Sequence, residues 1–83
     1  MSVFEVVKKY IDILDVIGLL DMGAPKDEYD VESHMIAERI TTDISSDELS
    51  EIMATVFSKM FDREMEKNTF IQTAENIISE LKQ

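Results

Sequence analysis

The most informative stretch of the chain is SSDELSEIMATVFSKMF, residues 45–61. Its first four residues form an S-x-x-E capping box, in which the side chains of Ser45 and Glu48 satisfy each other's free backbone N–H groups. Apolar residues then recur every three or four positions, the spacing that places them on one face of a helix. They are Leu49, Ile52, Met53, Val56, Phe57, Met60 and Phe61. The stretch therefore predicts an amphipathic helix with one face in a core.

One helix is predicted on each side of this stretch. Toward the C-terminus the apolar pattern lapses over residues 62–68, and a second capping box, Thr69 to Gln72, opens a helix. Its apolar face consists of Phe70, Ile71, Ala74, Ile77, Ile78 and Leu81. Toward the N-terminus, Asp30 is a favourable N-cap for a helix over residues 31–41, with Tyr29 packed at its entrance. The inner face of that helix consists of Ser33, Ile36, Ala37 and Ile40.

A further helix at the N-terminus is apolar around most of its circumference. Its main stripe is formed by Val3, Val7, Tyr10, Leu14 and Ile17. A helix of this kind is usually central in a bundle or shared with a partner. We expect it to end at Gly18, because glycine readily adopts the left-handed conformation that terminates helices.

Both glycines and the only proline lie between Gly18 and Pro25. Because the helix-breaking residues are concentrated there, helices are expected on either side of one ordered loop that extends from Gly18 to Asp30. No repeat or linker divides the chain. The sequence therefore predicts a single all-α domain over residues 1–83, a compact bundle of four short helices.

The composition limits the classes of function. Eighteen acidic residues against eight Lys and Arg give a formal net charge of −10. Binding to nucleic acid or to anionic membranes is disfavoured, because both need a basic surface. The chain has no cysteine, which excludes disulfides and thiolate metal sites. With neither a membrane-spanning run nor a signal-peptide pattern, a cytoplasmic location is expected.

Carboxylates are densest around the start of the second predicted helix, at Asp27, Glu28, Asp30 and Glu32. Hard cations prefer oxygen ligands, but this spacing does not match a calcium-binding loop. We favour the interpretation that these acids complement the positive end of the helix dipole. No metal ion or other cofactor is expected.

The remaining polar residues do not indicate catalysis. His34 is the only histidine, so it has no second base with which to form a catalytic arrangement. Its position one turn before Glu38 predicts an exposed side chain. We expect no enzymatic activity.

Six methionines are the other unusual feature of the composition. Met53 and Met60 fall on the core stripe of the third predicted helix. Off the predicted stripes lie Met22, Met35 and Met65. These three either pack in gaps or form an adaptable binding surface.

The segment before the second predicted helix contains two short motifs, LDVIGL at residues 14–19 and PKDEYD at residues 25–30. They resemble the W-D-P-x-G-[LV] and P-x-D-E-Y-D motifs of a family of small bacterial proteins known as a domain of unknown function. The matching residues are Asp15, Gly18, Pro25, Asp27, Glu28, Tyr29 and Asp30. Leu14 replaces the family's Trp and Val16 replaces its Pro. Residues 57–61 and 74–81 are also similar to the family's C-terminal half.

This resemblance implies a compact helical domain with no established activity. Domains of similar appearance occur among toxin-immunity proteins, which implies inhibitor binding as a role.

The charge distribution favours a non-enzymatic interaction protein that binds a basic protein partner. Residues 21–50 carry −7 of the net charge of −10, so this third of the chain can steer association with a positive protein. The candidate interaction face consists of Asp21, Asp27, Glu28, Asp30, Glu32 and Glu38. An immunity-like inhibitor of a basic nuclease toxin is one concrete form of this hypothesis.

Three alternatives stay open at this point. The acidity can serve solubility alone. The chain can be a self-associating structural module, a homodimer that buries the apolar first helix. A carboxylate-based cation-binding or enzymatic role is the third.

Overall fold

The computed structural model describes residues 2–15, 18, 21–23 and 28–83. Within these residues the chain forms four α-helices: α1 (Val3–Leu14), α2 (Asp30–Ala37), α3 (Ser46–Phe61) and α4 (Ile71–Leu81). A short 3₁₀-helix, η1 (Lys67–Thr69), precedes α4. The described part of the chain contains no strand, so the predicted all-α fold is confirmed.

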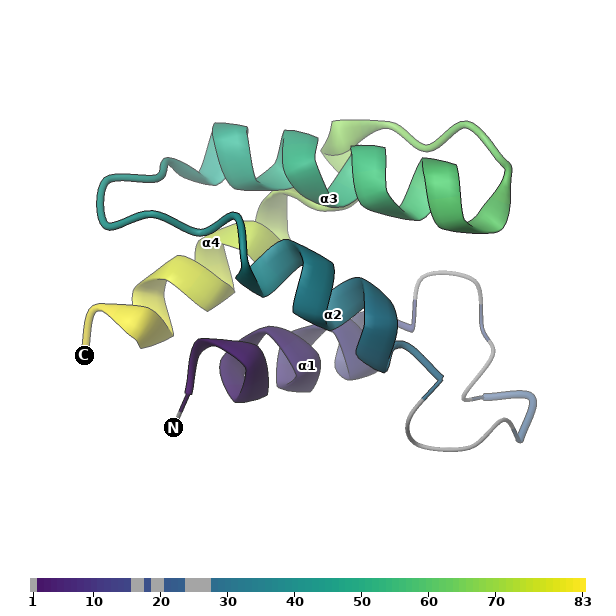
Figure 1. Ribbon diagram of the computed structural model, residues 1–83, viewed down its shortest axis with the longest axis horizontal. Coiled ribbons are helices and arrows are strands. Elements are labelled where there is room, and N and C mark those ends of the chain that lie inside the picture. Colours follow the sequence, from purple (N-terminus) through teal and green to yellow (C-terminus); the bar gives the residue numbers. More distant parts are fainter. Residues whose placement is uncertain (1, 16–17, 19–20, 24–27) are drawn as a thin grey trace.

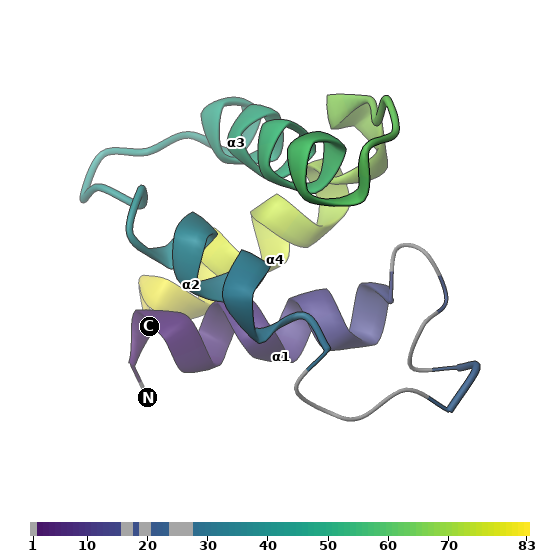
Figure 2. The same ribbon diagram turned by 45° about the vertical axis from the view of Figure 1, so that its right-hand side comes forward.

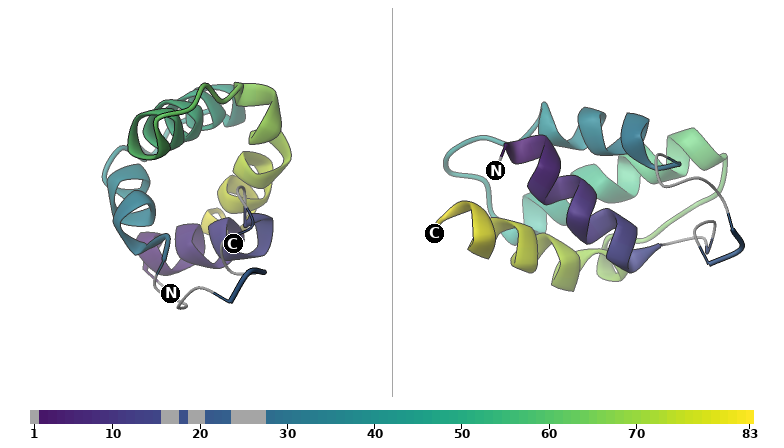
Figure 3. Two further views of the ribbon diagram at one scale, coloured as in Figure 1. Left: turned by 90° about the vertical axis from the view of Figure 1, so that its right-hand side faces the viewer. Right: turned by 90° about the horizontal axis from the view of Figure 1, so that it is seen from below.

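The four helices form a ring in which each helix packs against two neighbours (Figure 3). α1 and α3 lie opposite each other, and both contact α2 and α4. Successive helices run in opposite directions, so the two chain ends and the α2–α3 connection lie at the same end of the bundle (Figures 1 and 2). This is the up-and-down topology expected when short connections join antiparallel helices.

The core lies inside this ring and centres on aromatic side chains. Phe57 of α3 is fully buried, and its ring stacks on those of Phe61 and Phe70 with centroids 5.8 and 5.4 Å away. The ring of Tyr29 packs edge-on against Phe57 and Phe61. The other buried apolar residues are Val6, Val7, Ile11, Ile36, Leu49, Met53, Ala54, Val56, Ala74 and Ile77. All four helices contribute to this single core.

The capping box predicted for α3 is confirmed. The backbone N–H of Glu48 donates to Ser45 Oγ at 3.1 Å, and that of Ser45 donates to Glu48 Oε1 at 3.2 Å. An equivalent box, which the sequence analysis missed, opens α1 through Ser2 and Glu5. Both boxes follow the same S-x-x-E spacing, so the second was readable from the sequence.

The predicted end of the first helix was wrong. α1 ends at Leu14, and Asp15, with a φ of 44°, is the left-handed residue that terminates it, three positions before Gly18. The carboxylate of Asp15 explains why a non-glycine residue occupies this conformation. Its Oδ1 accepts a hydrogen bond from the Tyr29 hydroxyl at 2.6 Å, and its Oδ2 accepts one from the Asp21 backbone N–H at 2.9 Å.

About half of the predicted Gly/Pro loop, including Pro25, lies outside the described residues, as does Ile17 of the predicted first-helix stripe. In the described part, Gly18 and Gly23 have φ values of 73° and 93°, a region that residues with a side chain rarely adopt. The burial of Tyr29, predicted at the entrance of the second helix, is confirmed.

Two predicted N-caps were also wrong. Asp30 is the first residue of α2 and not its cap, because its carboxylate is drawn into an ion pair with Lys8 of α1. Thr69 ends η1, and the fully buried Phe70 occupies the N-cap position of α4, so ring packing and not a capping box fixes this helix start.

The second helix is shorter than predicted. It ends at Ala37, and the next N–H groups, those of Arg39 and Ile40, bond to carbonyls only three residues earlier. This tighter winding closes the helix and lets Ile40 and Ile44 pack against the core from the α2–α3 connection.

The methionines divide as follows. Met53 is buried in the core as predicted, whereas Met60 is 41% exposed, contrary to prediction, because it lies at the edge of the α3 stripe. Met35 and Met65 pack against the core, so the packing alternative holds for both, and Met22 is 77% exposed.

Two substitutions at Tyr29 separate the contribution of its ring from that of its hydroxyl. Tyr29→Ala removes a fully buried ring, and we expect the free energy of unfolding to fall by about 2–4 kcal/mol. Tyr29→Phe removes only the hydrogen bond to Asp15, and a loss of about 1 kcal/mol is expected. Urea denaturation measures both values. Unchanged stability in Tyr29→Ala would contradict the place of this ring in the core.

Two fully buried serines provide a matched pair for a second test. Ser50 Oγ donates to the carbonyl of Asp47 at 2.8 Å, whereas Ser33 Oγ has no hydrogen-bond partner among the described residues. Ser50→Ala should therefore lower the free energy of unfolding by about 1 kcal/mol, and Ser33→Ala should leave it level or raise it by about 1 kcal/mol. Thermal and urea unfolding compare the two, and an equal loss in both variants would refute the distinction.

Candidate interaction surface

The structure separates the six residues of the candidate interaction face. Asp21, Glu28 and Glu38 are exposed, and Asp27 lies outside the described residues. Glu28 and Glu38 flank opposite ends of α2, a helix of eight residues that is about 12 Å long at 1.5 Å per residue. Asp21 lies in the segment after α1, where its backbone N–H donates to Asp15 Oδ2, so the exposed members do not form one compact cluster.

Asp30 is half-buried and already has a basic partner. Its Oδ1 lies 2.8 Å from Lys8 Nζ, which also lies 2.9 Å from Asp12 Oδ2. Burial lowers the pKa of Lys8, but hydrogen bonds to Asp30 and Asp12 outweigh it, so the pKa is raised overall. This group joins α1 to α2, and its role is structural.

Glu32 does not belong to an exposed face, which corrects the prediction. The residue is only 5% exposed, and its Oε1 has no hydrogen-bond partner among the described residues. Burial raises the pKa of the Glu32 carboxyl above its ordinary value, and the negative charges of Glu28 and Asp30 raise it further. A hydrogen bond from the backbone N–H of Glu32 itself lowers this pKa, but burial is the larger effect. Glu32 lies three residues after Tyr29 and four before Ile36, both fully buried, so it shares their inward face.

Additional exposed acids lie where the sequence analysis placed no site. Asp43 lies in the α2–α3 connection, and Glu48 and Glu51 lie on the first turns of α3. Asp47, between them in the sequence, forms an ion pair with Lys67, whose Nζ lies 2.5 Å from Asp47 Oδ1. The local charge in residues 21–50 signals Asp43, Asp47 and Glu48 but not Glu51, and the packing of α2 against α3 brings the helices that carry these acids together.

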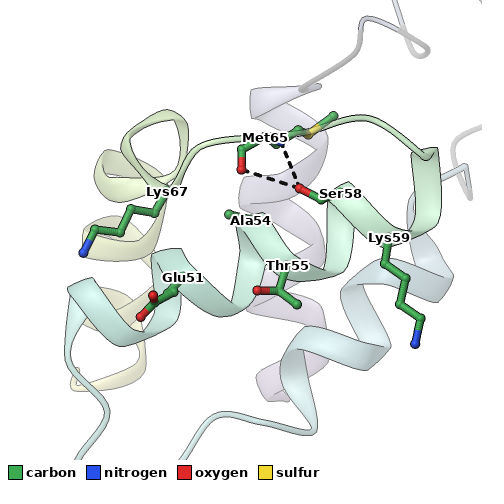
Figure 4. A pocket seen from close by; sticks show the side chains of 7 residues that line it. All are labelled: Glu51, Ala54, Thr55, Ser58, Lys59, Met65 and Lys67. Carbon is green, nitrogen blue, oxygen red and sulfur yellow. Dashed lines mark hydrogen bonds between the residues drawn. The ribbon is translucent and has the colours of Figure 1, made fainter.

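A shallow groove of about 570 Å³ runs along the outer side of α3 (Figure 4). Its lining residues are Glu51, Ala54, Thr55, Ser58, Lys59, Met65 and Lys67. The backbone N–H of Met65 donates to Ser58 Oγ at 2.9 Å, which holds the segment after α3 against the helix. Both signs of charge line this groove, so it offers no field of one sign to a ligand.

Three residues hold α1 to α4 on the other side of the ring. Lys9 Nζ and the Tyr10 hydroxyl both donate to Glu80 Oε1, at 2.5 and 2.8 Å. The Lys9 ammonium, followed by the Tyr10 hydroxyl, holds the pKa of Glu80 below its ordinary value. Glu80 and Lys9 are therefore unavailable to a partner.

His34 is exposed, as predicted, and its ring stacks on Phe4 of α1 with centroids 3.8 Å apart and planes at 9°. The described residues contain no group of three or more His, Asp or Glu side chains placed to hold a metal ion. Nor does any helix in this part of the chain have the length and apolar character needed to cross a membrane.

No family model, curated protein or solved structure matches the chain. The resemblance noted in the sequence therefore stays a prediction. Its two motifs do meet in space, because Tyr29 of the second motif donates to Asp15 of the first.

The burial of Glu32 predicts a specific dependence of stability on pH. Because its pKa is higher in the folded chain than in the unfolded one, folding binds protons between these two values, and stability falls as the pH rises through that window. Glu32→Gln removes this penalty, so its melting temperature should exceed that of the wild type at neutral pH. The gain should shrink as the pH falls toward about 4, where the carboxyl is protonated in both states.

Glu38→Gln, an exposed change at the end of the same helix, is the control and should show no such trend. Melting curves from acidic to neutral pH measure all three proteins. If Glu32→Gln were less stable than the wild type at neutral pH, the charged carboxylate would have stabilising partners in the folded chain, and the prediction would be wrong.

Proposed function

We propose that the protein is a non-enzymatic interaction protein that binds a basic protein partner through an acidic surface along α2 and the start of α3. This acidic surface consists of Asp21, Glu28, Glu38, Asp43 and Glu51. One observation carries the proposal. Lys8, Lys9 and Lys67 are held in ion pairs with other acids, whereas these five exposed acids have no ion-pair partner in the described part of the chain.

The electrostatic consequence of this arrangement is a mainly negative field, which Arg39, Lys59 and Lys67 weaken around Glu51. Screening limits the reach of an exposed charge to about 8 Å at physiological ionic strength, so Glu28 and Glu38, at opposite ends of α2, attract an approaching molecule at two separate places. A net charge of −10 on 83 residues adds a longer-range attraction for a positive partner. Such fields increase the rate of association more than they slow dissociation.

A non-enzymatic role is supported by the setting of the only histidine. The His34 ring is stacked on Phe4, and neither a second histidine nor a cysteine exists in the chain to supply a base or a thiol nucleophile. Domains similar to the family that the two motifs resemble occur among toxin-immunity proteins, so an inhibitor that covers a basic toxin is one concrete form of the proposal.

Self-association is a second candidate, favoured by exposed apolar side chains. Ile13 of α1 is 72% exposed and Val31 of α2 is 58% exposed. A second copy of the chain could bury such residues. Sedimentation analysis of the purified protein distinguishes a monomer from a homodimer.

The acidic surface predicts a charge-specific effect on association. A binding partner captured with the protein as bait is purified and its binding kinetics are measured at low and high salt. Neutralising Glu28, Glu38 and Asp43 together (to Gln, Gln and Asn) should lower the on-rate by about tenfold at low salt and weaken its salt dependence. Stability should stay level, because exposed charges contribute little to folding.

The matched control neutralises Glu64, Glu66 and Glu75, which are exposed acids away from α2. Both triple variants change the net charge equally. If the acidic surface is specific, neutralising Glu28, Glu38 and Asp43 should lower the on-rate more than the control does. Equal on-rates for the wild type and both variants would show that the acidity serves solubility alone. Equal losses in both variants would show that net charge acts without a defined surface.

A further inference from the structure

A second surface lies at the end of the bundle that carries both chain termini (Figures 1 and 3). Here a pocket of about 350 Å³ opens between the start of α1, the α2–α3 connection and the end of α4. Its apolar walls are formed by Val3, Ile40, Ile44, Ile78 and Leu81. Four of these pack against the core and remain only partly buried, and Val3 is 39% exposed. The pocket is therefore an extension of the core that opens to solvent.

The charges at this pocket differ from those at the other hollows of the surface. Its polar lining consists of Thr41, Thr42 and Lys82, without any carboxylate. The groove on α3 and two further hollows each contain at least one glutamate. In a chain with eighteen acids and eight Lys and Arg, a pocket whose only charge is positive is a marked departure.

Lys82 is free to contact a ligand. It is exposed, and it forms no ion pair with any described residue. It lies directly after Leu81, at the rim between the apolar walls and a neighbouring hollow that also contains Ser46, Ser79 and one carboxylate, that of Glu75. An apolar cavity with one ammonium at its mouth complements a molecule with an apolar tail and an anionic head.

We propose that this pocket binds a small monoanionic amphiphile, a short fatty acid whose tail enters the apolar walls and whose carboxylate faces Lys82. A volume of about 350 Å³ is at the lower end of the range for ligand pockets, which suits a short tail. The net charge of −10 favours a head with one negative charge over a doubly charged phosphate. A cationic head is disfavoured by Lys82 itself.

The test uses decanoate, below its critical micelle concentration, with the full chain labelled for NMR. We expect saturable shifts of the amide signals of Thr41, Thr42 and Lys82, with a stoichiometry of one. Decanol, which shares the tail but lacks the charge, should bind more weakly, and decyltrimethylammonium more weakly still.

Three variants assign the binding to this pocket. Lys82→Gln should weaken decanoate about threefold to fivefold and leave decanol unchanged, since an exposed charge pair contributes less than about one decade in affinity. Lys59→Gln is the control, because it removes one exposed lysine from the α3 groove. Val3→Glu places a carboxylate at the pocket mouth on the first residue of α1, where the helix dipole tolerates an acid, and should abolish decanoate binding.

The proposal would be overturned by shifts that do not saturate, by shifts centred on another surface, or by equal decanoate affinities in the wild type and Lys82→Gln. A dimer that Val3→Glu dissociates, with no decanoate binding to the wild type, would also overturn it, because a second copy would then fill the pocket.

Discussion

The packing of Phe57 against Tyr29, Phe61 and Phe70 is the interaction on which the rest of the fold depends. It joins α3 to the start of α2 and to the start of α4, so one ring fixes the positions of three helices. Full burial of such a side chain contributes about 1.5–3 kcal/mol, and each favourable ring pair adds about 0.5–1.5 kcal/mol. In a domain of 83 residues, whose total stability is of the order of 5–10 kcal/mol, this is a large share.

The same packing explains where the sequence was informative and where it was not. Apolar spacing predicted α3 and α4 and most of their buried residues, because a helix must turn one face to the core whatever its neighbours are, but it missed Ser50, Ala54 and Thr73. Capping was predicted correctly at Ser45, where the box is local and exposed. It was predicted wrongly at Asp30 and Thr69, where a distant lysine and a buried ring determine the helix start.

The candidate interaction face was less predictable than the fold, since a list of acids carries no information on burial or pairing. Glu32 and Asp30 have the same charge and lie two residues apart, yet one is buried without a partner for Oε1 and the other is paired with Lys8. Which acids remain available depends on the antiparallel packing of α1 on α2, a contact between segments that are far apart in the sequence. The periodicity of apolar residues does not predict which residues of α1 face which residues of α2.

The balance of charge also bears on which partner suits the exposed apolar residues. Two copies of a chain with a net charge of −10 repel each other, and a homodimer must overcome this repulsion with apolar contact alone. A basic partner gains from the same charge and can cover Val31, which lies on α2 beside the acids at its two ends. Exposed apolar side chains on an acidic helix therefore favour a partner of opposite charge over a second copy. The apolar pocket at the chain termini adjoins this acidic side, because its lining residues Thr42 and Ile44 flank Asp43, so an occupant of one surface affects binding at the other.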